Sequence, residues 1–261
     1  MEPTGALKLI ARAGYAARGV VYLIIGYFAL LAAINWGKVS GTREALEAIL
    51  GRPHGVALLG LAIAGLLGHA GWRLAQSLLD ADHHGADLKG LAVRAALFGS
   101  ALAHLSLAVF AIGLIVHRDA SGIGASAAGW FAALAERGWA RGMTLVLAFI
   151  TLGVGIAHLV KGWRAGYERH FAADEEALAR FRLICRLGLI ARGIAFAVVA
   201  TLTFYAGAIH DFEAAPGLDD ALDSVQALPF GGLLLAVMAC GLLAFAFYSF
   251  AEAIYRRVDM R

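Results

Sequence analysis

Six long apolar stretches constrain the fold of this chain more than any other feature of its sequence. Each has about 20 residues or more, the length that an α-helix needs to cross the hydrocarbon core of a bilayer. Because backbone polar groups in lipid must be satisfied internally, we expect an all-α polytopic membrane protein with six transmembrane helices. The stretches cover about residues 14–35, 55–79, 91–116, 142–165, 184–209 and 230–254.

The composition excludes a soluble domain. Of the 261 residues, 61% are hydrophobic and 16% are charged, whereas ordinary soluble domains have roughly 45–50% and about 25%. The two cysteines, Cys185 and Cys240, belong to no Cys-x-x-Cys motif, so they indicate neither a disulfide framework nor a thiolate metal site. We therefore expect a single integral membrane domain over residues 1–261.

The basic residues predict the orientation of the chain. Sixteen Lys and Arg residues lie at the ends, in the even-numbered loops or in the adjoining helix turns, and six lie on the opposite side. By the positive-inside rule, both termini are expected in the cytoplasm of a multi-pass protein of the bacterial inner (cell) membrane. The basic excess then reflects topology, with the lipid bilayer as partner and no role in nucleic-acid binding.

A sequence signature, Arg-x-Gly-x-x-Ala-Arg-Gly, opens two of the apolar stretches. It is found in "ARAGYAARGVVY" (11–22) and in "CRLGLIARGIAF" (185–196). A weaker copy starts at Arg94, where Ala96 and Ser100 replace the first Gly and the second Arg. The spacing predicts three helical hairpins that enter the membrane in the same direction, as parallel repeats with pseudo-threefold symmetry. The repeats cover approximately residues 8–82, 88–171 and 180–257.

Three short amphipathic segments lie in the loops opposite the termini. They read "TREALEAIL" (42–50), "AGWFAALAE" (128–136) and "LDDALDSVQAL" (218–228). We expect short helices that lie flat on the outer interface of the bilayer. A further amphipathic stretch, "ADEEALARF" (173–181), predicts a helix that leads into the fifth span with its acidic residues in the first turn.

From Leu9 to Arg257, the three signature-bearing hairpins resemble a bacterial membrane family known as a domain of unknown function, number twelve hundred and six. The signature is sharp in the first and third hairpins and eroded in the second. The resemblance supports the six-helix, three-repeat fold and implies no particular activity.

Three polar residues occupy matching places near the cytoplasmic ends of the even-numbered spans: Gln76, Lys161 and Glu252. An isolated charge at membrane depth costs several kcal/mol, so we expect Lys161 and Glu252 to form an ion pair with Gln76 hydrogen-bonded beside them. Simple placement at the interface is the alternative.

Five arginines belong to the signatures: Arg12, Arg18, Arg94, Arg186 and Arg192. At the cytoplasmic edge their guanidinium groups could reach lipid phosphates while the stems stay in lipid, so they are expected to be anchors. For Arg18 and Arg192, binding of a lipid headgroup or another ligand is the alternative.

Three histidines lie well inside the spans: His69, His104 and His158. Paired histidines on facing helices could hold a b-type haem, and the similar depths of His69 and His158 would suit one. The fifth span has no interior histidine, however, so hydrogen-bonded histidines, or proton or metal-ion handling, are favoured over haem. "DHHGAD" (82–87) could bind a divalent ion, but a solvated turn is the favoured interpretation.

No motif indicates catalysis, and we expect no catalytic residue, no bound metal and no cofactor. The favoured function is a non-enzymatic membrane bundle, a scaffold or an accessory to a membrane complex, with a membrane-protein partner or a second copy. The alternatives are a permease for a small solute, ion or proton, and a b-type haem protein. A water-filled cavity lined by His69, His158, Lys161 and Glu252 would favour the permease.

Overall fold

The computed structural model confirms the six predicted spans. It describes residues 5–34, 46–47, 50–51, 53–117, 139–209 and 218–257. In that part of the chain, six helices are long and apolar enough to cross a membrane. The protein is therefore an all-α, multi-pass membrane protein. The six helices are α1 (Gly5–Ala33), α3 (Gly55–Leu78), α4 (Leu88–His117), α6 (Ala140–Trp163), α7 (Glu175–Ile209) and α9 (Gly231–Tyr255).

Two of these helices begin earlier than the apolar stretches do. Helix α1 starts at Gly5, and α7 starts at Glu175 because the amphipathic stretch before the fifth span continues directly into it. Asp174 caps α7, since its carboxylate accepts a hydrogen bond from the backbone N–H of Ala177 at 2.7 Å. Glu175 and Glu176 in the first turn interact favourably with the positive end of the helix dipole.

The amphipathic segment before the sixth span also forms a helix, α8 (Leu218–Gln226), as predicted. Ala221 and Leu222 are buried, so its apolar stripe packs against the rest of the protein. The segment 128–136 lies outside the described residues, and the segment 42–50 lies mostly outside them.

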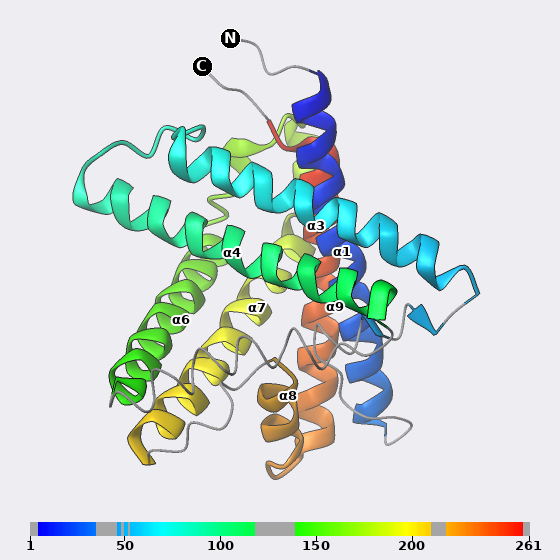
Figure 1. The fold of residues 1–261 in the computed structure, drawn as a ribbon, viewed down its shortest axis with the longest axis vertical. Helices are drawn as coiled ribbons and strands as arrows, with labels where there is room; N and C mark the ends of the chain where they lie inside the picture. The colour runs from blue at the N-terminus through cyan, green and yellow to red at the C-terminus, as the bar shows by residue number, and fades with distance from the viewer. Residues whose placement is uncertain are drawn as a thin grey trace.

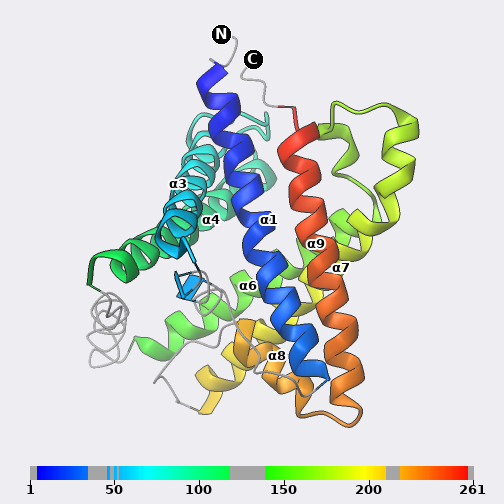
Figure 2. The same ribbon diagram turned by 90° about the vertical axis from the view of Figure 1, so that its right-hand side faces the viewer.

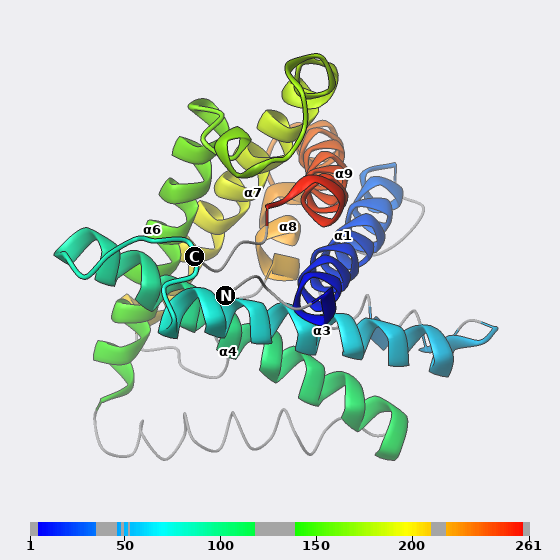
Figure 3. The ribbon, with the colours of Figure 1, turned by 90° about the horizontal axis from the view of Figure 1, so that it is seen from above.

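The six long helices form three side-by-side pairs: α1 with α9, α3 with α4, and α6 with α7. In Figure 1, α1 and α9 run from top to bottom while α3 and α4 lie across them. Helix α7 packs on α9 and α3 packs on α1, but the described residues form no extensive interface between α4 and α6. Figure 3 shows the three pairs from above. The pseudo-threefold symmetry of the repeats remains a prediction.

The start of α1 and the end of α9 lie at one end of the molecule, which we call the terminal end (Figures 1 and 2). Two connections lie there as well. The turn between α3 and α4 contacts Arg256 through Asp82, and the loop between α6 and α7 pairs with Arg256 through Phe171. The other ends of the helices point away from this region.

The first glycine of the signature marks a close helix crossing. A Cβ atom at Gly14 of α1 would lie 2.6 Å from the Cα of His69 on α3, and one at Gly188 of α7 would lie 2.4 Å from the backbone N of Phe245 on α9. In the second hairpin this position is Ala96, which is exposed on α4. The glycine is therefore present in the two hairpins whose own helices pack together, because only glycine lets the backbones approach so closely.

Candidate functional site

A network of six charged side chains and one amide lies at the terminal end. We call it the ionic cluster. Its members come from α1, α3, α6, α9, the turn after α3 and the residue that follows α9. They are Arg18, Arg73, Gln76, Asp82, Lys161, Glu252 and Arg256.

Glu252 lies at the centre of the ionic cluster and is only 1% exposed. Its carboxylate forms an ion pair with Arg18, accepts a hydrogen bond from Nη1 of Arg256 at 3.0 Å, and lies 3.9 Å from Nζ of Lys161. The structure thus brings Lys161 and Glu252 together. The nearer partner of Lys161 is the hydroxyl of Tyr248, to which it donates at 2.7 Å.

Asp82 forms a second acidic centre beside Glu252. Its Oδ2 accepts hydrogen bonds from Nη2 of Arg256, at 2.9 Å, and from Nε2 of Gln76. The amide oxygen of Gln76 in turn accepts from Nη1 of Arg73 at 3.0 Å. Gln76 therefore lies in the same network as Glu252 but is joined to it through Asp82 and Arg256.

Sequence reasoning missed three members of the ionic cluster: Arg73, Asp82 and Arg256. One signal for Arg73 was available, since it lies three residues before Gln76 and therefore on the same face of α3. Asp82 and Arg256 are 174 residues apart in the chain. No local pattern relates a turn residue to the end of a helix so distant.

The ionic cluster contains more cations than anions. Its four basic side chains face two carboxylates, so Glu252 and Asp82 are each shared by several donors. Charges removed from water are costly unless they are paired and hydrogen-bonded. The two carboxylates consequently link helices from all three predicted hairpins: α1, α3, α6 and α9.

The signature arginines occupy three different environments. Arg12 is exposed, as an interfacial anchor would be. Arg94 and Arg186 instead donate to backbone carbonyls at the ends of other helices. Nε of Arg94 donates to the carbonyl of Ser77 on α3 at 2.7 Å, and Nε of Arg186 donates to the carbonyl of Gly162 on α6 at 3.2 Å. They cap these helices, where a cation also interacts favourably with the helix dipole.

Arg18 is buried between helices, and Arg192 is half-buried beside aromatic rings. Arg18 is 6% exposed and, besides pairing with Glu252, donates to Oγ of Ser249 at 3.1 Å. The guanidinium group of Arg192 stacks on aromatic rings, 4.5 Å from the ring centroid of Tyr22 and 4.3 Å from that of Phe245. The guanidinium group of Arg18 is thus directed into the protein, whereas the anchor role of Arg192 remains a prediction.

The three interior histidines divide into two groups. The rings of His69 and His104 are in direct contact, with centroids 4.4 Å apart. His69 also accepts a hydrogen bond from Nε of Arg73 at 3.3 Å. The ring of His158 packs instead against Phe196, with centroids 5.5 Å apart.

The turn between α3 and α4 is organised by Asp80. Its carboxylate accepts hydrogen bonds from the backbone N–H groups of Gly85 and His84, at 2.9 and 2.8 Å. The bond from Gly85 is the main reason that the pKa of Asp80 is lowered. Among the described residues, no group of three or more His, Cys, Asp or Glu side chains could hold a metal ion.

The loop between α6 and α7 lies beside the ionic cluster and includes a short 3-10 helix, η1 (Glu168–His170). The carbonyl of His170 accepts from the backbone N–H of Arg257 at 2.8 Å, and the N–H of Ala172 donates to the carbonyl of Tyr255 at 2.6 Å. Burial, together with the positive charge of Arg256, lowers the pKa of His170 to about 4.

We expect His170 to stay neutral down to about pH 5. Its folded pKa lies below the value of about 6.5 of an unfolded chain, so its contribution to stability is complete above pH 6.5 and decreases as the pH falls toward 4. NMR titration of the imidazole, assigned with the His170→Gln variant, measures the midpoint. A midpoint near 6.5 in the folded protein would contradict this placement.

The fold and the ionic cluster define a class: a multi-pass helical membrane protein with a buried charge network at one end. The family model described as Domain of Unknown Function (DUF1206) matches residues 13–80 and 187–256, more than half of the chain. The chain belongs to this family. The two matched segments correspond to the first and third predicted hairpins, which carry the sharper signatures.

The chain is also similar to "Uncharacterized protein YxxB" of Bacillus subtilis (strain 168). The two are 27% identical over 258 residues, which cover 97% of this chain and 92% of that protein. No solved structure matches.

Proposed function

We propose that this protein is a non-enzymatic scaffold, or an accessory to a membrane complex, in the bacterial inner (cell) membrane. The observation that carries the proposal is the pairing inside the ionic cluster. Glu252, its most buried carboxylate, is shared by Arg18, Arg256 and Lys161. A general acid or base must be free to exchange a proton with a substrate, whereas this carboxylate is fully engaged with neighbouring helices.

Such a network suits a protein that presents a fixed shape. Polar groups that satisfy one another in a low-dielectric interior hold the elements that carry them in one arrangement. The close crossings at Gly14 and Gly188 further restrict α1 against α3 and α7 against α9. We propose that the partner is another membrane protein or a second copy of this chain, and that no haem or other cofactor is needed.

We propose further that both termini lie in the cytoplasm. The support is the asymmetry of the basic residues, sixteen on the terminal side against six on the other. The ionic cluster would then lie near the cytoplasmic face.

Cross-linking in the native membrane, followed by purification and mass spectrometry, tests the scaffold function. We expect the protein to be cross-linked to one stoichiometric partner or to a second copy of itself. When the tag is placed on the partner instead, the purification should recover this protein. We expect proteoliposomes that contain the protein to be no more permeable to protons than protein-free vesicles.

A proton or solute flux that Glu252→Gln or His69→Ala abolishes would contradict the scaffold and favour a permease. The absorption spectrum of the same purified sample tests the third candidate, because a Soret band would identify a haem protein.

A further inference from the structure

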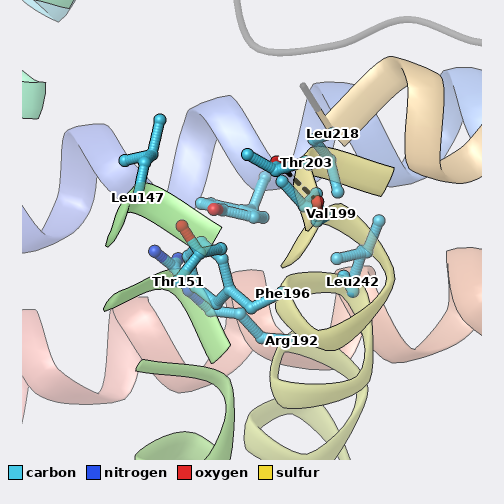
Figure 4. A pocket seen from close by; sticks show the side chains of 10 residues that line it. Leu147, Thr151, Arg192, Phe196, Val199, Thr203, Leu218 and Leu242 are labelled. Carbon is cyan, nitrogen blue, oxygen red and sulfur yellow. Dashed lines mark hydrogen bonds between the residues drawn. The ribbon is translucent and has the colours of Figure 1, made fainter. Parts of the chain in front are cut away.

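A cavity of about 300 Å³ lies among α1, α6, α7, α8 and α9 (Figure 4). The ring of Phe245 lies between its Arg192 and Arg18 of the ionic cluster, with both guanidinium groups near the ring. Its walls are mostly apolar, with Phe196, Val199 and Leu242 among them. Arg192 from α7 lines one side and is the only charged residue among the described residues of the lining. A cavity of this size is at the lower end of the range for small-molecule sites.

Arg192 has no ion-pair partner among the described residues; Glu252 acts on it only at longer range and is bonded to Arg18 and Arg256. Its Nε and Nη1 atoms are buried and have no hydrogen-bond partner, although the guanidinium group is surrounded by the rings of Tyr22, Phe196 and Phe245. Aromatic faces attract a cation but accept no conventional hydrogen bond. A buried donor without an acceptor is costly, so this group is poised to bind an anion.

The repeat explains why Arg192 lacks the partner that Arg18 has. The two arginines occupy the same place in the signature, and Arg18 is neutralised by Glu252 on α9. On α6, the helix that packs beside α7, the position that corresponds to Glu252 is Lys161. Among the residues that the structure describes, the first arginine thus has a paired carboxylate and the second has none.

We propose that the cavity binds an amphiphilic monocarboxylate, with its carboxylate on Arg192 and its hydrocarbon chain along the apolar walls. The planar guanidinium group matches a carboxylate in shape and charge. Leu147, which contributes to the wall on α6, is 36% exposed, so the cavity borders the lipid-facing surface of that helix. An amphiphile dissolved in the bilayer has a direct path to it.

Octanoate is the probe, and its binding to the purified full-length protein at pH 7.5 is measured by calorimetry and by the rise in melting temperature. We expect saturable binding of octanoate, with octanol and inorganic phosphate each at least tenfold weaker. Octanol retains the chain without the charge, and phosphate retains the charge without the chain. If octanol or phosphate bound as tightly as octanoate, the proposed ligand class would be overturned. The absence of saturable octanoate binding would also overturn it and would mean that water alone satisfies Arg192.

Two variants locate the site. Arg192→Met keeps the length of the side chain and removes the charge, so octanoate affinity should fall at least tenfold. Val199→Phe fills the cavity without touching Arg192 and should abolish binding even if Arg192→Met does not fold. The control is Arg12→Met, which removes the exposed arginine of the signature copy in α1. Its affinity for octanoate should stay within twofold of wild type. Unchanged affinity in either cavity variant would overturn the proposal.

Discussion

The Glu252→Gln variant should lose most of its folded population. The substitution keeps the size of the side chain but leaves Arg18, Arg256 and Lys161 without their shared negative charge in a buried site. Removing one partner of a buried ion pair typically costs about 3–5 kcal/mol, a large part of the roughly 5–15 kcal/mol that stabilises a native protein. Thermal unfolding and size-exclusion chromatography in mild detergent measure the loss.

The matched control is Glu176→Gln. Glu176 also pairs with an arginine four residues further along its helix, Arg180, but both side chains are exposed, at 79% and 74%. Exposed pairs are worth about 0–1 kcal/mol, so this variant should unfold within a few degrees of wild type. Similar stability in the two variants would mean that the ionic cluster does not hold the helices together.

The second large effect is expected from Gly188→Ala. The added Cβ atom would lie 2.4 Å from the backbone N of Phe245 and 2.5 Å from the carbonyl carbon of Ala244, so α7 and α9 must move apart. Overpacking costs typically about 1–3 kcal/mol, and backbone atoms cannot rotate away as a side chain could. At roughly 2–4 °C per kcal/mol for a chain of this size, the melting temperature should fall by about 2–12 °C.

Gly99→Ala on α4 provides the control for this prediction. Gly99 is exposed, and a Cβ atom there would meet nothing within 4 Å. Because alanine is the better helix former by about 1 kcal/mol, Gly99→Ala should leave the melting temperature unchanged or raise it. If the two variants melted alike, the close crossing of α7 and α9 would be refuted.

The helices and the contact between Lys161 and Glu252 were within reach of the sequence. A long apolar stretch needs a helix in lipid, and equivalent positions in a repeat fall at equivalent depths. The steep crossing of α3 and α4 over α1 was not predictable in this way, because helix tilt is set by packing against neighbours. Length and composition carry no information about it.

The arginines show a second limit of local patterns. Arg18 and Arg192 have the same signature around them, yet one is ion-paired and the other lines a cavity. The difference arises on the facing helices, in residues 161 and 252, and not in the signature itself. A repeat therefore predicts where a side chain lies along its helix more reliably than what that side chain meets.

The pairing of Arg18 with Glu252 also sets an order for assembly. The two residues are 234 positions apart, and ribosomes add roughly 5–20 residues per second, so α1 must wait about 10–50 s for its counter-charge. During that time the first helix holds an unneutralised arginine within its apolar stretch. Helix α1 can pack against α9 only after α9, the last helix, has been synthesised. The contact that involves the first helix is therefore among the last to form during biogenesis.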